Sequence, residues 1–102
     1  MKNAGLVFLL GWCFFLLNPS ETPAENQKLR VHFIDVGLGD AILIEPPDSR
    51  SILIDAGPQE YSEALLSYLS TTGVKKIGTA VITHPHRNHF EGFFSILPSV
   101  PM

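Results

Sequence analysis

The stretch THPHRNHFEG, Thr83–Gly92, decides how the rest of the chain is read. It holds three of the four histidines, His84, His86 and His89, within six residues. An apolar run typical of a strand precedes it, and Pro85 disfavours helical backbone at the first of these histidines. Imidazoles spaced H-x-H-x-x-H where a strand gives way to a helix can converge on one point, and zinc is well suited to such nitrogen ligands. The spacing therefore predicts a metal loop.

A helix is expected directly after this loop. Asn88, followed three residues later by Glu91, has the form of a capping box, in which Asn88 is the N-cap. His89 would then lie in the first helical turn, beside the loop that carries the other two histidines. The cap alone explains Asn88 without any chemical role. The fourth histidine, His32, is expected to be exposed on its strand face, as a surface residue or as one whose hydrogen bonds are satisfied.

The N-terminal segment has the order of a secretory signal peptide. Lys2 precedes an apolar run over residues 4–17, which Pro19 helps to end. The run is shorter than the roughly 20 residues of a membrane span. We therefore predict a signal peptide at residues 1–24 and an exported mature domain at residues 25–102, with no stable membrane span after cleavage. A membrane anchor is the alternative if the signal stays uncleaved.

Composition limits the size and type of this domain. The chain has 102 residues, is 45% hydrophobic, carries a formal net charge of −3 and contains one cysteine. This length is enough for one small domain. The acidic balance provides no basic surface for binding nucleic acid through its phosphates. A single cysteine also excludes an intrachain disulfide.

Three antiparallel strands, a helix and a fourth strand are predicted. Apolar and polar side chains alternate over residues 29–33, and residues 41–45 and 51–55 are short β-branched runs joined by a Pro- and Asp-rich connection. A helix with its apolar face on Tyr61, Leu65, Tyr68 and Leu69 should end at Gly73. The apolar residues 77–82 are expected to form an interior strand. This order indicates an α/β layered fold.

One helix is too small to cover all the apolar strand positions. A sheet face without a partner layer predicts self-association or a loosely packed state. The positions concerned are Leu29, Val31, Phe33, Ile42, Ile44, Ile52, Ile54 and Val81.

The histidine loop resembles the H-x-H-x-D-H signature of the metallo-β-lactamase superfamily. FIDVGLGDAILIE, residues 33–45, resembles the D-V-G-Q-G-D-A opening of one branch, with Leu38 in place of Gln. That branch includes the extracellular hydrolase domain of bacterial DNA-uptake (competence) channel proteins. SILIDAG, residues 51–57, matches the family's strand ending in Asp-x-Gly. The resemblance implies an αββα sandwich, of which this sequence, ending at Met102, contains the N-terminal half.

The resemblance also implies roles for individual residues. His84 and His86 match two ligands of the first metal, and His89 matches a ligand of the second. Asp55 matches a carboxylate that supports the metal loop, although an ordinary turn-forming role is the alternative. Asn88 occupies the position of the family's Asp, which ligates the second metal and orients the attacking water. Asn keeps a carbonyl oxygen but lacks the charge, so the catalytic residue is left unassigned.

The implied function is that of an exported zinc-dependent hydrolase. In such an enzyme a metal-activated water attacks a phosphodiester or another ester. Nucleic acid is a candidate substrate by analogy with the branch. A complete relative would hold one or two zinc ions, and this chain at most one, weakly. The alternative is a catalytically inactive remnant that binds metal weakly or not at all.

Overall fold

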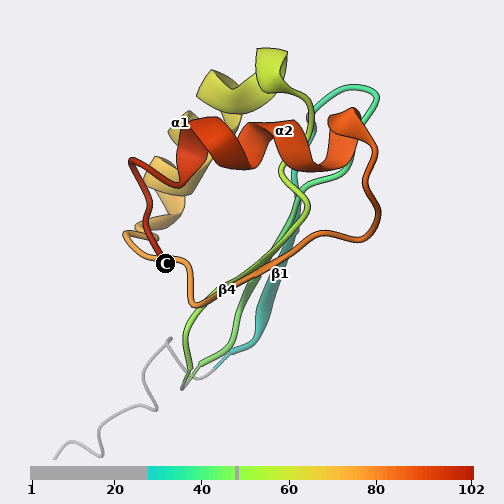
Figure 1. Ribbon diagram of the computed structural model, residues 1–102. Coiled ribbons are helices and arrows are strands. Elements are labelled where there is room, and N and C mark those ends of the chain that lie inside the picture. Colours follow the sequence, from blue (N-terminus) through green and yellow to red (C-terminus); the bar gives the residue numbers. More distant parts are fainter. Residues whose placement is uncertain (1–27, 48) are drawn as a thin grey trace, which may run out of the picture.

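Four short strands form one mixed sheet in the computed structural model, which describes residues 28–47 and 49–102 (Figure 1). The predicted signal peptide lies outside the described residues. In the part of the chain that is described, no helix is both long and apolar enough to cross a bilayer. In chain order the elements are β1 (Arg30–Phe33), β2 (Ile42–Glu45), β3 (Ile52–Ile54), the 3-10 helix η3 (Gln59–Tyr61), α1 (Ser62–Thr72), β4 (Thr79–Val81) and α2 (Arg87–Ile96).

The strand order is β1-β2-β3-β4, with antiparallel pairing as far as β3 and parallel pairing between β3 and β4. The predicted antiparallel meander is therefore confirmed. The prediction of an interior fourth strand is wrong, because β4 pairs only with β3 in the described part of the sheet. Within this segment Ile77 is fully buried but precedes the strand, whereas Val81 and Ile82 are exposed.

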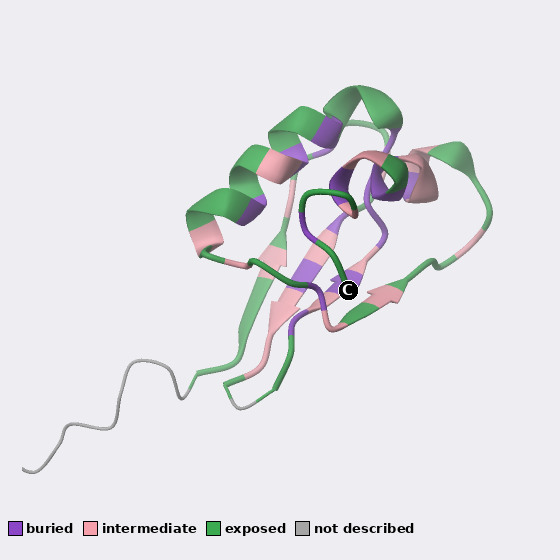
Figure 2. Ribbon diagram, turned by 60° about the vertical axis from the view of Figure 1, so that its left-hand side comes forward, coloured by how far each residue is buried: buried purple, intermediate pink, exposed green. Residues whose placement is uncertain are grey.

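Both α-helices pack on one face of the sheet (Figure 2). Leu43 of β2 and Leu53 of β3 are opposite each other in the register and are fully buried. The helices complete the core with apolar residues of their own, so the core lies between one sheet face and the helix layer. The buried core residues are Val36, Ala41, Leu43, Leu53, Ala56, Leu65, Leu69, Ile77, Phe93, Ile96 and Val100.

The buried face of α1 is narrower than predicted. Leu65 and Leu69 are fully buried as expected, but Tyr61 and Tyr68 remain exposed. A tyrosine ring carries a hydroxyl that needs a polar partner, so both rings lie at the border of the helix instead of in the core. Gly73 ends α1 in the left-handed conformation, with φ of 80°, as predicted.

The other sheet face has no described element packed on it. One sheet with helices on one face is a mixed α/β arrangement. Over residues 28–47 and 49–102 the chain forms one sheet, whereas an αββα sandwich has two. The uncovered apolar face is the one expected from the alternating strand pattern.

Candidate metal centre

Three segments far apart in sequence meet at one end of the sheet. Asp55 follows β3 directly, and its backbone N–H donates to the Val81 carbonyl of β4 at 2.8 Å. The parallel pairing of these strands places the loop after β4, with His84, next to Asp55. Asp55 has a φ of 54°, a left-handed conformation that Asp tolerates better than most residues. This bend turns the chain toward α2, whose first turn carries His89.

The Asp55 carboxylate is the centre of the hydrogen bonds at this end of the sheet. It is 1% exposed. The Thr83 backbone N–H donates to Oδ1 at 2.8 Å, and the Thr83 hydroxyl donates to Oδ2 at 2.5 Å. His89 Nδ1 lies 2.8 Å from Oδ2. Burial raises the pKa of Asp55, but the bonds from Thr83 and the His89 bond and charge outweigh it, so this pKa lies below its ordinary value.

The three predicted histidines gather here, but they are not equivalent. The ring centroids of His84 and His89 are 3.9 Å apart, and His86 stands edge-on to His84 at 4.7 Å. The donor atoms that lie within 4.8 Å of one another belong to Asp55, His84 and His89. His86 is exposed and is the N-cap residue of α2, with extended backbone, which keeps it outside this group. The third member of this compact group is therefore Asp55, whereas the sequence predicted His86.

Two carboxylates lie near Nδ1 of the His89 ring, and one of them is within hydrogen-bond distance. Nδ1 contacts Asp55 at 2.8 Å and lies 3.6 Å from Oδ2 of Asp40. A proton on Nδ1 satisfies this contact and leaves the lone pair on Nε2 free for a metal. The Asp40 carboxylate, in the turn between β1 and β2, therefore lies close to the His89 ring, although its side chain is largely exposed.

Asn88 does not cap α2, contrary to the prediction. The helix begins at Arg87 with His86 as its N-cap, two residues earlier than predicted, and no side chain of the N-cap bonds to its N-terminus. The Asn88 amide instead donates to the Leu38 carbonyl in the β1–β2 turn, and Glu91 pairs with Arg87. The turn comes close because Gly39 has no side chain: a Cβ there would lie 2.1 Å from the Asn88 carbonyl oxygen. Sequence spacing alone could not reveal this long-range partner.

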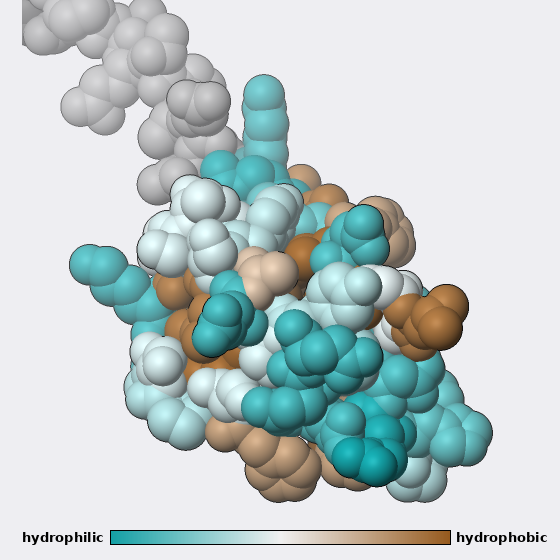
Figure 3. All heavy atoms as spheres, turned by 90° about the horizontal axis from the view of Figure 1, so that it is seen from above, coloured by the Kyte–Doolittle hydropathy of each residue, from teal (hydrophilic) through white to brown (hydrophobic). Residues whose placement is uncertain are grey.

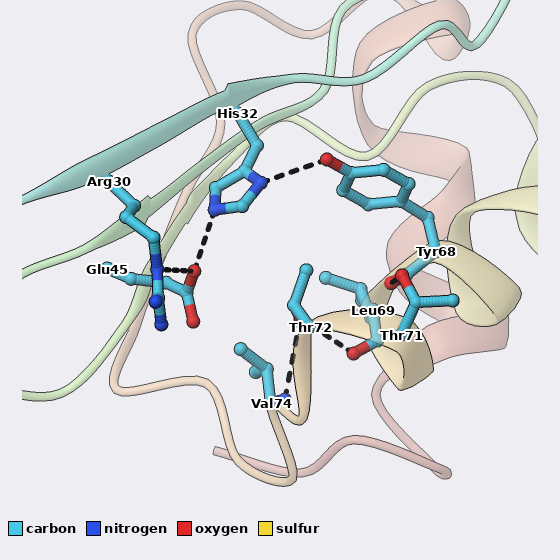
Figure 4. Close-up of polar contacts among 8 residues, drawn as sticks. All are labelled: Arg30, His32, Glu45, Tyr68, Leu69, Thr71, Thr72 and Val74. Carbon is cyan, nitrogen blue, oxygen red and sulfur yellow. Dashed lines mark hydrogen bonds and ion pairs between the residues drawn. The ribbon is translucent and has the colours of Figure 1, made fainter. Parts of the chain in front are cut away.

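His32 lies outside the metal centre and has its own partners (Figure 4). Its Nε2 contacts Glu45 Oε2 at 2.7 Å, and its Nδ1 contacts the Tyr68 hydroxyl at 2.9 Å. Arg30 donates to the same Glu45 oxygen at 3.1 Å. These contacts join β1, β2 and α1, which confirms that the hydrogen bonds of His32 are satisfied. The expected exposure of His32 is wrong, because its side chain is only 17% exposed and faces α1.

Comparison of the chain with models of protein families, with curated proteins and with solved structures found no match. The chemistry of the site is therefore inferred from its own residues. One buried, ionised carboxylate and two imidazoles could hold a metal ion.

Proposed function

We propose that the chain binds zinc through His84 and His89, which the Asp55 carboxylate holds in position, and that this centre is of the metallo-β-lactamase type. The convergence of a strand end, a loop and a helix start on these three side chains supports the proposal. Imidazole nitrogen is a common zinc ligand. Bound zinc would supply a Lewis acid for hydrolysis of a phosphodiester or another ester. That substrate class, and export of the chain, rest on the sequence patterns and stay predictions.

Each residue of the group has a distinct role in this proposal. His84 and His89 are the ligands, and Asp55 accepts the His89 Nδ1 hydrogen, which leaves Nε2 for the metal. Thr83 holds the loop in position through its two bonds to the same carboxylate. His86, which is exposed beside His84, serves as an additional ligand on the open side.

Zinc titration of the full 102-residue chain by calorimetry tests this proposal. We expect His84→Ala and His89→Ala to reduce zinc affinity at least 100-fold, because each removes a ligand. His86→Ala should reduce it roughly 10-fold, since this residue lies outside the compact group. His32→Gln is the matched control: it removes a histidine whose partners are Glu45 and Tyr68, and zinc affinity should not change. Absence of saturable binding, or an equal loss in the control, would refute the assigned site.

A metal-binding protein without catalytic activity is the second candidate, and Asn88 favours it. The side chain is a neutral amide whose N–H is used by the Leu38 carbonyl. It therefore offers no carboxylate to orient water or to accept a proton from it. Both candidates require zinc binding, so they differ only in turnover.

If the second candidate is correct, the zinc-loaded chain will not hydrolyse a chromogenic phosphodiester, and neither will Asn88→Asp. The substitution should tighten zinc binding several-fold, because it adds a negative charge near the centre. It should also lower the free energy of unfolding by about 1 kcal/mol, since a carboxylate cannot donate to the Leu38 carbonyl. Gln59→Glu is the control: it also converts an amide that donates, to Ser95, into a carboxylate, and zinc affinity should not rise. Zinc-dependent turnover that His84→Ala abolishes would favour the enzyme over the second candidate.

A further inference from the structure

The hydroxyl of Thr83 links the two ligand histidines of the proposed centre. Its Oγ1 atom donates to Asp55 Oδ2 at 2.5 Å and also lies 3.0 Å from Nδ1 of His84. The same Oδ2 atom lies 2.8 Å from Nδ1 of His89. The Nδ1 atoms of both rings are therefore connected to one carboxylate oxygen, directly for His89 and through the Thr83 hydroxyl for His84.

The direction of these hydrogen bonds follows from the number of protons available. The Asp55 carboxylate accepts on both oxygens, at Oδ1 from the Thr83 N–H and at Oδ2 from the Thr83 hydroxyl. An ionised carboxylate has no proton to give, so the single hydroxyl proton lies between Oγ1 and Oδ2. Oγ1 then has only lone pairs left for His84. The Nδ1 atom of His84 must be the donor in that contact.

We propose that Thr83 is a positioning residue that selects the tautomer of His84, with the hydrogen on Nδ1 and the Nε2 lone pair free for a metal. Metal-binding histidines commonly donate their second ring N–H to an acceptor, which fixes both the tautomer and the ring orientation. In this chain one carboxylate sets both rings. The consequence for zinc rests on the proposed function, whereas the tautomer is a property of the metal-free chain.

Burial does not select the tautomer of His84. This residue is only half-buried, and His86 beside it is exposed. The surface above the helices is also mostly hydrophilic or neutral, with hydrophobic side chains in separate groups (Figure 3). Water can therefore reach the His84 ring, and a neutral imidazole in water can carry its proton on either nitrogen. A fixed acceptor at Nδ1 makes one of the two forms the stable one.

NMR spectroscopy of the ring nitrogens in the metal-free 102-residue chain tests this proposal, because protonated and unprotonated ring nitrogens differ in chemical shift. At a pH where the rings are neutral, we expect His84 in the Nδ1–H form. His32 is an internal reference of the opposite kind. Its Nε2 lies 2.7 Å from the Glu45 carboxylate and its Nδ1 lies 2.9 Å from the Tyr68 hydroxyl, so its hydrogen belongs on Nε2.

Two substitutions of Thr83 separate the hydroxyl from the rest of the residue. Thr83→Val removes the hydroxyl but keeps the β-branched shape and the backbone N–H that donates to Oδ1. His84 should then shift away from the Nδ1–H form. Thr83→Ser retains the hydroxyl and should preserve that form. Thr71→Val is the matched control, because it removes a threonine hydroxyl that donates to the Tyr68 carbonyl in α1.

Zinc titration of the same variants measures the consequence for binding. Thr83→Val should reduce zinc affinity roughly 10-fold to 100-fold, the usual effect of removing a group that orients a metal ligand. Thr83→Ser should retain most of the affinity, and Thr71→Val should change neither the affinity nor the His84 tautomer. Circular dichroism establishes that each variant is folded.

The two readouts distinguish this proposal from the proposed function. An Nε2–H form of His84 in the unmodified chain would overturn the role of Thr83, even if Thr83→Val does not fold. A His84 tautomer that folded Thr83→Val leaves unchanged, or an equal shift in Thr71→Val, would also overturn it. The expected tautomers in a chain that does not bind zinc would support the role of Thr83 and refute the proposed function.

Discussion

Gly92→Ala is expected to lower the free energy of unfolding by about 3 kcal/mol, which is the upper range for overpacking a core. Gly92 is buried in α2, and a Cβ there would lie 1.9 Å from the Ala56 carbonyl oxygen. The backbones are also bonded directly: Gly92 N–H donates to the Gly57 carbonyl at 3.0 Å, and Ala56 N–H donates to the His89 carbonyl at 2.8 Å. The two nearest atoms belong to the Ala56 backbone and the third is its Cβ, so no flexible side chain can move aside and the clash can be relieved only by moving α2.

This movement should also affect the metal centre. His89 is on the same helix, and its 2.8 Å contact with Asp55 depends on how closely α2 approaches the end of β3. Urea denaturation gives the stability change, and zinc titration should show a loss of affinity beyond 10-fold. Gly73→Ala is the control, because no atom lies within 4 Å of its Cβ and only the left-handed backbone adds about 1 kcal/mol of strain. Equal effects of the two substitutions would contradict this account of Gly92.

The features predicted correctly from the sequence depend on local patterns. Alternation with period two predicted the three antiparallel strands and also the uncovered apolar face, because it assigns each side chain to one side of a strand. The left-handed stop at Gly73 followed from the conformational freedom of glycine. The gathering of His84, His86 and His89 followed from their closeness in sequence, since six residues cannot separate widely across a loop and one helical turn.

The errors concern contacts between distant segments. Asn88 was predicted to cap α2, but its partner is the Leu38 carbonyl, 50 residues away in sequence. Whether Asp55 or His86 joins the compact donor group depends on the parallel pairing of β3 with β4 and on the left-handed bend after β3. The resemblance gave Asp55 a supporting role, yet only the three-dimensional arrangement reveals Thr83 as its main donor.

Asp55→Ala is expected to reduce the free energy of unfolding by about 3–5 kcal/mol, the usual result of removing one partner from a buried pair. Thr83 and His89 would both lose their acceptor, and the metal loop would no longer be tied to β3. Ala also fits poorly at a φ of 54°. Zinc binding should become undetectable in calorimetry. Asp55→Asn should cost less stability, because Asn tolerates this backbone conformation and keeps one oxygen acceptor.

The pH dependence of stability tests whether the charge of Asp55 is responsible. Its pKa is lower in the folded chain than its ordinary value of 3.8, so the folded state binds the proton more weakly than the unfolded state. The stabilisation by the charge is therefore fully present above the unfolded pKa and is lost as the pH falls through the folded pKa.

In urea denaturation from pH 7 to pH 3, the stability difference between the unmodified chain and Asp55→Asn should shrink below about pH 4. Asp35→Asn, which changes an exposed carboxylate that accepts from the Gly37 N–H, should have a small effect throughout. A difference for Asp55→Asn that stays constant down to pH 3 would show that shape and hydrogen-bond geometry, not charge, are what Asp55 contributes.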